Sequence, residues 1–126
     1  MVRLLNHNYV IGLIWQAHLE GREHGFTECN PKEYPVLEDL WVLQQQQDKW
    51  FIVYYDKLSS EKLNEMVSFK FISGSHGAMT REEILLHIVN HTTYHRGFLA
   101  DMFYKISVKP PTTDLPVFLQ NREAVL

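Results

Sequence analysis

Apolar residues recur every three or four positions along three segments of the chain, which is the spacing of a helix with one buried face. The first segment covers residues 2–20 and stops at Gly21, and the second covers residues 36–58 and stops before a pair of serines. The third covers residues 80–105 and opens with Thr-Arg-Glu-Glu, which has the form of a capping box. The pattern therefore predicts an all-α fold built on three long helices.

The segments between and after these helices have other patterns. Residues 22–35 contain glycine and proline without any period, and we expect them to form a loop. Near residues 64–73 polar and apolar side chains alternate, which predicts a short β strand or hairpin. The tail at residues 109–120 has three prolines and several large apolar residues, so we expect an extended tail that folds back over the helices. The four glutamines at residues 44–47 are interpreted as a solvated part of the second helix.

Length, charge and cysteine content narrow the class of protein. At 126 residues the chain has the size of one domain, taken as residues 1–126, and its formal net charge of −3 gives no basis for expecting a nucleic-acid partner. Cys29 is the only cysteine, which excludes an intrachain disulfide and fits a reducing compartment. No apolar run approaches the roughly 20 residues that span a bilayer, and the apolar start lacks a signal-peptide cleavage site. We therefore expect a cytoplasmic protein without a membrane partner.

Several histidines occupy positions that the helical pattern reserves for buried side chains. His91 and His95 lie in the apolar seam of the third helix, and His7 takes an aliphatic position in the seam of the first. Burying an imidazole without a partner costs roughly 1–3 kcal/mol, whereas one metal ion would satisfy all three rings. A His-x-x-x-His pair can reach one cation from a single helix face. With His7 added, three neutral nitrogens would bind the ion and leave one position open for water or substrate.

The same histidines can also be core side chains with ordinary hydrogen bonds, in a plain helical interaction domain. His18 lies roughly 16 Å from His7 by helix rise, so it cannot share the same ion and is interpreted as an edge residue. His87 lies at the edge of the seam, where it either supports the ligands or faces solvent. Arg96 either binds an anionic group of a substrate or pairs with a nearby carboxylate. Two further histidines fall in expected loops and are interpreted as solvated, His24 and His76.

Three stretches of the sequence resemble the DinB family in order and spacing: LLNHNYVIGLIWQAHLEG, HIVNHTTYHRGFLADM and KPPTTDLPVFL. That family is a four-helix bundle whose members bind a divalent metal through three histidines. The resemblance implies a DinB-like helical bundle with His7, His91 and His95 as the metal ligands. The family's first helix has no counterpart here, so we expect either that a second copy covers the exposed groove in a homodimer or that the chain is shortened. Two positions depart from the family, Phe98 in place of a common glutamine and Gly12 in place of a common acidic residue.

For some relatives the resemblance implies metal-dependent transfer of a low-molecular-weight thiol, such as bacillithiol or mycothiol, to an electrophilic small molecule. A divalent cation would favour the thiolate, which is the nucleophile, and zinc and nickel are the first candidates for that cation. Because a cation also activates water, a metal-dependent hydrolase is an alternative. A non-catalytic or stress-related bundle stapled by its metal is another. No residue is assigned a catalytic role from the sequence.

Overall fold

The computed structural model describes residues 1–125. Its long helices are α1 (Val2–Glu20), α2 (Leu37–Asp56) and α4 (Arg81–Lys105). The shorter elements are α3 (Ser60–Leu63), β1 (Met66–Lys70), β2 (His76–Thr80) and α5 (Leu115–Val125). The predicted helical fold class is therefore confirmed, although α2 begins and ends slightly inside the predicted range 36–58. Within the described residues no helix combines the length and the apolar character that a membrane crossing would need.

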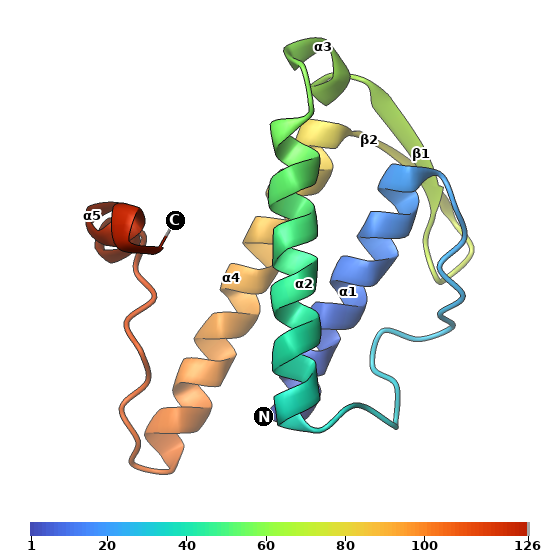
Figure 1. Ribbon diagram of the computed structural model, residues 1–126. Helices are drawn as coiled ribbons and strands as arrows, with labels where there is room; N and C mark the ends of the chain where they lie inside the picture. The colour runs from blue at the N-terminus through green and yellow to red at the C-terminus, as the bar shows by residue number, and fades with distance from the viewer. Residues whose placement is uncertain (126) are drawn as a thin grey trace.

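Helix α1 lies against both α2 and α4, and the three run side by side (Figure 1). The β hairpin packs where α1 ends and α4 begins. The hydrophobic core lies at that end of the molecule, where Trp15 and Leu19 of α1, Val67 and Phe69 of β1 and Ile84 of α4 pack together. Partly buried residues of α2 and β2 pack against this core. His7 therefore lies toward the opposite end of α1 from Trp15 and Leu19, with Ile11 between them packed against the core.

Strands β1 and β2 form an antiparallel hairpin whose register runs from Met66 opposite Thr80 to Lys70 opposite His76. The strand predicted near residues 64–73 is confirmed in β1, where Val67 and Phe69 are buried and the alternate residues are exposed. The second strand of the hairpin, β2, lies after the predicted range. Gly77 leaves room for the ring of Phe69, because a Cβ atom at Gly77 would lie 2.9 Å from that ring.

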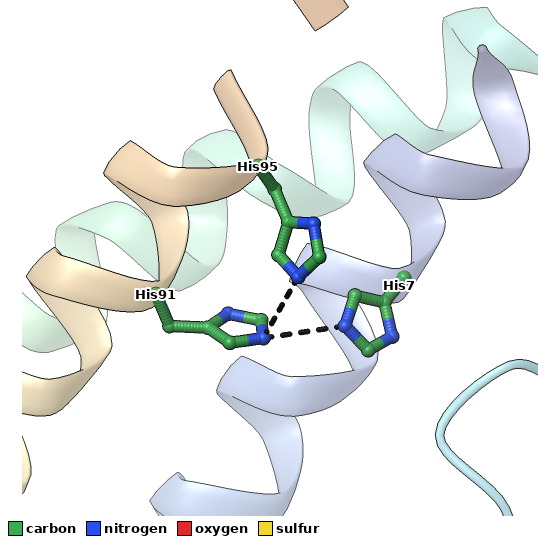
Figure 2. A group of neighbouring side chains, drawn as sticks. All are labelled: His7, His91 and His95. Atoms are coloured by element: carbon green, nitrogen blue, oxygen red, sulfur yellow. Dashed lines mark hydrogen bonds between the residues drawn. The ribbon is translucent and has the colours of Figure 1, made fainter. Parts of the chain in front are cut away.

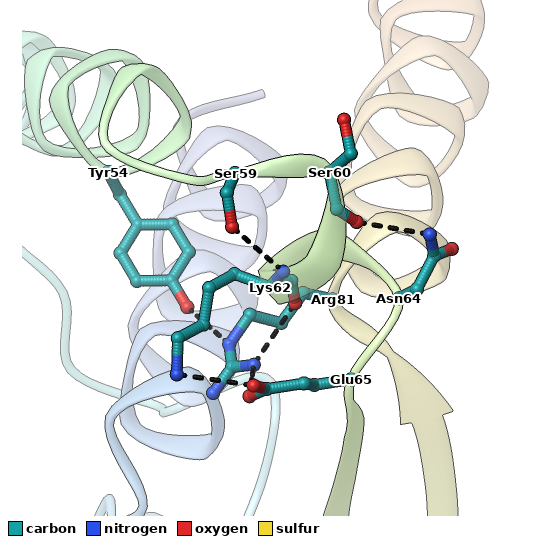
Figure 3. A network of polar contacts seen from close by, with 7 residues as sticks. All are labelled: Tyr54, Ser59, Ser60, Lys62, Asn64, Glu65 and Arg81. Atoms are coloured by element: carbon teal, nitrogen blue, oxygen red, sulfur yellow. Dashed lines mark hydrogen bonds and ion pairs between the residues drawn. The ribbon is translucent and has the colours of Figure 1, made fainter.

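An arginine at the first position of α4 connects three elements (Figure 3). Arg81 donates a hydrogen bond to the hydroxyl of Tyr54 on α2 at 3.0 Å and another to the carbonyl of Lys62 on α3 at 3.1 Å. It also pairs with Glu65 at 2.7 Å, while Lys62 lies 3.2 Å from the other carboxylate oxygen. Each exposed ion pair is worth little alone, so the network serves mainly to align these elements.

The start of α4 has the capping box predicted from the sequence. The Thr80 hydroxyl accepts a hydrogen bond from the backbone N–H of Glu83 at 3.1 Å. The Glu83 carboxylate in turn accepts from the backbone N–H of Thr80 at 2.9 Å. Two backbone donors that the helix itself cannot satisfy are thus paired.

The chain after α4 departs in part from the expected tail. Ser107 has a φ of 59°, in the left-handed region, and the segment 108–114 is extended as predicted. Residues 115–125 then form α5, with Pro116 in the first turn, where a missing N–H is tolerated. The expectation that the tail covers the helices is wrong, because residues 111–122 are exposed and α5 stands apart from the long helices (Figure 1). The paired prolines at 110 and 111 favour an extended backbone, which carries α5 away from the helices.

The interpretation of residues 44–47 as solvated is wrong for Gln47. Its side chain is only 6% exposed and its amide donates a hydrogen bond to the Tyr9 carbonyl of α1 at 2.9 Å. Gln44 donates to the Gln47 side-chain oxygen at 3.3 Å and to Asp48 at 2.9 Å. A polar residue can thus occupy the interface between α1 and α2 because its hydrogen bonds are satisfied there.

Candidate metal centre

Three histidines from two helices meet where α1 packs against α4 (Figure 2). His7 lies in the second turn of α1, and His91 and His95 lie one turn apart on α4. The Nε2 atom of His91 is 3.2 Å from that of His7 and 3.1 Å from that of His95. The three residues singled out from the sequence are therefore brought together, with one ring nitrogen of each turned toward a common point.

The spacing of these nitrogens fits a bound metal ion. One ligand atom from each residue lies within 4.8 Å of the others. Nitrogen ligands about 2.0–2.1 Å from a tetrahedral zinc ion stand about 3.3 Å apart, close to the two measured contacts. A hydrogen bond alone explains the geometry less well, because Nε2 of His91 has at most one proton and faces two other nitrogens. The cluster could hold a metal ion.

A backbone carbonyl from the loop between α1 and α2 orients the first of these rings. Nδ1 of His7 lies 3.0 Å from the carbonyl oxygen of Cys29. Because a carbonyl only accepts, Nδ1 must carry the proton, and the lone pair of Nε2 is left facing the other histidines. An outer hydrogen bond of this kind fixes the tautomer of metal-binding histidines. Sequence reasoning missed it, because any residue type at position 29 could supply the same carbonyl.

The surroundings of the cluster favour neutral imidazoles, which are the form that binds metals. Burial, with smaller contributions from His95, His7 and His87, lowers the pKa of His91 to about 4. Burial and then His7 also lower the pKa of His95. Lone pairs on both α4 histidines are thus available at neutral pH.

The other histidines lie outside this cluster. The ring of His87 packs 5.3 Å from that of Trp15 and 5.8 Å from that of His91, so it is neither a member of the trio nor fully exposed. His18 faces His24 with 5.5 Å between the ring centroids, and both line a separate hollow of about 550 Å³ with Phe69. His24 lies in a loop as predicted but is only partly solvated, and its Nδ1 accepts a hydrogen bond from the backbone N–H of Phe26. His76 is exposed as expected, but it is the first residue of β2 and does not lie in a loop.

Three other residues of α4 lie close to His95 along the helix, Tyr94, Arg96 and Phe98. Arg96 donates to the hydroxyl of Thr93 at 3.1 Å, and within the described residues it forms no ion pair with a carboxylate. Tyr94 is exposed, and its ring stands edge-on to that of His95 at 5.2 Å. Phe98 is also exposed, and its ring lies 5.0 Å from that of Tyr94. An aromatic surface therefore adjoins the histidine cluster.

Comparison with known proteins adds a family-level finding. The sequence model of the DinB family matches residues 1–124. The chain is also similar to Protein DinB of Bacillus subtilis (strain 168), with 26% identity over 125 residues that cover 92% of this chain and 70% of that protein. No solved structure matches the chain. The match to the family spans the helices that carry all three clustered histidines.

Proposed function

This chain belongs to the DinB family, and we propose that His7, His91 and His95 bind one divalent metal ion at which a low-molecular-weight thiol is activated for transfer to an electrophile. The observation that carries the proposal is the convergence of three ring nitrogens, 3.1 and 3.2 Å apart at the measured contacts. Zinc and nickel are the first candidates, because both accept imidazole ligands.

The ligand set supports a reactive centre more than a purely structural one. Three neutral nitrogens leave a coordination position open, whereas structural zinc sites are closed by four protein ligands. A divalent cation held here would favour the thiolate form of a thiol, as cations do for coordinating sulfur. In the transfer, the sulfur forms a bond to the electrophilic carbon, the leaving group departs with the bonding electrons, and the thiol proton passes to solvent. The protein's own part is to hold His7 in the required tautomer through Cys29.

The composition of the cluster favours thiol transfer over hydrolysis. Among the described residues the cluster contains no aspartate or glutamate. A hydrolase commonly uses such a group as a general base toward water. A thiol needs less assistance, because its pKa is far lower than that of water and its thiolate is a strong nucleophile.

Metal analysis of protein purified without a histidine tag tests the site itself. We expect about one equivalent of zinc or nickel in the wild type. His91→Ala should weaken binding by more than the roughly 10–100-fold typical of losing only a supporting hydrogen bond. His76→Ala, which removes an exposed histidine, is the matched control and should bind normally. Equal metal content in wild type and His91→Ala would contradict the assignment.

An activity assay tests the reaction class. Bacillithiol and mycothiol are each mixed with monobromobimane, which becomes fluorescent when a thiol displaces its bromide. We expect the wild type to accelerate at least one reaction, with the acceleration lost after chelation and restored by metal. A metal that only staples the helices would instead raise the melting temperature without accelerating any of these reactions.

A further inference from the structure

Two buried polar atoms beside the histidine cluster have no hydrogen-bond partner among the described residues. They are Oδ1 of Asn8 and Nδ1 of His95. Buried polar atoms are nearly always paired, so each unpaired one calls for an explanation. The two atoms are also complementary, since an amide oxygen accepts hydrogen bonds and a ring N–H donates them.

The positions of the two residues direct both atoms to the same part of the interior. Asn8 follows His7, whose ring centroid lies 4.8 Å from that of His95. Asn8 also lies one helical turn before Gly12, which faces Gln47 of α2, so the Asn8 side chain is on the side of α1 between α4 and α2. His95 directs Nε2 toward the cluster and Nδ1 away from it (Figure 2), and Nδ1 is buried. Both unpaired atoms are therefore buried on helices that pack against each other, α1 and α4.

Metal binding at Nε2 determines which nitrogen of His95 carries the proton. A neutral imidazole that gives its Nε2 lone pair to a metal must be protonated on Nδ1. Metal-binding histidines almost always donate this second N–H to an acceptor, as His7 does to the carbonyl of Cys29. His95 lacks such an acceptor among the described residues, and Asn8 carries a buried acceptor that has no donor.

We infer that Asn8 is the positioning residue for His95: when the metal site proposed above is filled, its Oδ1 accepts a hydrogen bond from Nδ1–H of His95. This inference rests on the proposed metal site. The two outer contacts would then be a backbone carbonyl for His7 and a side-chain amide for His95. Without metal the Asn8 oxygen remains unpaired. Asn8 would thus strengthen metal binding but lower the stability of the metal-free protein.

This trade-off distinguishes a positioning residue from one that only supports the fold. Asn8→Leu keeps the branched shape and the number of heavy atoms of the side chain but has no acceptor. We expect it to leave the melting temperature of the metal-free protein unchanged or higher, because it removes an unpaired buried oxygen. Its zinc affinity, measured by competition with a chromophoric chelator, should fall about 10–100-fold. A purely structural residue would lower the melting temperature of the metal-free protein instead.

The matched control is Asn6→Leu, which changes the other buried asparagine next to His7. Its polar atoms are not among the buried unpaired ones, so zinc affinity should remain within about threefold of wild type. Asn8→Asp keeps an acceptor and should also retain zinc affinity, even if Asn8→Leu fails to fold. Equal losses in Asn8→Leu and Asn6→Leu would overturn the inference, as would a loss of affinity in Asn8→Asp as large as in Asn8→Leu.

Nuclear magnetic resonance of the zinc-loaded wild type gives a direct readout. Nδ1–H of His95 should appear as a slowly exchanging ring proton, and the signal should be lost or exchange rapidly in Asn8→Leu. A ring proton that is equally protected in both proteins would overturn the inference while leaving the metal site intact. Failure of the wild type to bind zinc would instead remove the proposed function and this inference with it.

Discussion

At the scale of single residues, the absence of a side chain at Gly12 allows α2 to approach α1 close to the histidine cluster. A Cβ atom at this position would lie 2.1 Å from the side-chain oxygen of Gln47. Gln47 is buried and is hydrogen-bonded to the carbonyl of Tyr9, two residues after His7. The small residue and the amide therefore hold the turn of α1 that follows the first histidine of the cluster.

Gly12→Ala is expected to destabilise the protein by about 1 kcal/mol. The steric cost of overpacking, about 1–3 kcal/mol, exceeds the helix-propensity gain of about 1 kcal/mol from replacing glycine by alanine. In a Gln47→Ala background the clash is absent, so the same substitution should stabilise by up to about 1 kcal/mol. Urea unfolding of the wild type, both single variants and the double variant measures this change of sign. Equal effects of Gly12→Ala in both backgrounds would show that the two residues do not compete for the same space.

The role of a single residue could be predicted where that residue interrupts the helical spacing of apolar side chains. His91 and His95 stood out because they occupy core positions of a helix whose other seam residues are apolar. Gln47 did not stand out, because a run of glutamines is typical of a solvated face and its partner is the backbone of another helix. The spacing of residues along the chain shows which face of a helix is buried. It does not show which distant residue forms a hydrogen bond with a given side chain.

At the scale of elements, α4 carries two of the three histidines, and its capping box satisfies backbone N–H groups at the start of this helix. The box is formed by Thr80 and Glu83, and the hydrogen bonds of Arg81 align the same end with α2 and α3. His91 lies eleven residues beyond the cap, roughly 16 Å along the helix axis. The cap should therefore affect the stability of the helix without changing the geometry of the histidine cluster.

Thr80→Ala is expected to lower the free energy of unfolding by about 1 kcal/mol, since replacing a capping threonine by alanine costs about 0.5–2 kcal/mol. Zinc affinity of the folded protein should stay within about threefold of wild type. The unfolding free energy from urea titration and the zinc affinity from chelator competition give the two values. Thr113→Ala, an exposed tail threonine, is the control and should alter neither. Reduced zinc affinity in Thr80→Ala would mean that the cap and the cluster are coupled.

The helices and strands that were predicted are those marked by the spacing and the terminal residues of their own sequence. The long helices have both period and end signals, and these are properties of neighbouring residues. A hairpin was one of the two predictions near residues 64–73, but the position of β2 was not predicted, because Gly77 and Ala78 have low β propensity and Phe69 packs over Gly77. Helix α5 was missed because the prolines of the tail indicate extended chain, although Pro116 falls in the one turn of a helix that accepts it.

At the scale of the whole molecule, large apolar side chains remain exposed on α2, α4 and α5. Examples are Leu37, Trp41, Ile52 and Tyr55 on α2, Leu86, Val89 and Tyr104 on α4, and Leu115 and Phe118 on α5. On α2 these side chains form a second apolar stripe beside the one that faces α1. Exposed apolar side chains grouped on one face of a helix are typical of interaction sites. We propose that a second copy of the chain covers this face of α2.

Light scattering after size-exclusion chromatography should then give a mass of two chains at micromolar concentration. Trp41→Glu should shift the mass toward one chain, because it places a charge in the exposed apolar stripe. Lys49→Glu changes an exposed residue elsewhere on α2 and should leave the mass at two chains. A mass of one chain for a stable, well-folded wild type would contradict the proposal.

The contact between Nδ1 of His7 and the Cys29 carbonyl has a further consequence for how the site tolerates change. Because the acceptor is a backbone atom, a side-chain substitution at position 29 leaves it in place. Insertions or deletions in the loop 21–36 displace it even though every histidine is retained. Chains that share all three histidines can thus differ in metal affinity solely through the length of this loop. Comparing only the metal-binding residues of two chains would not reveal this difference.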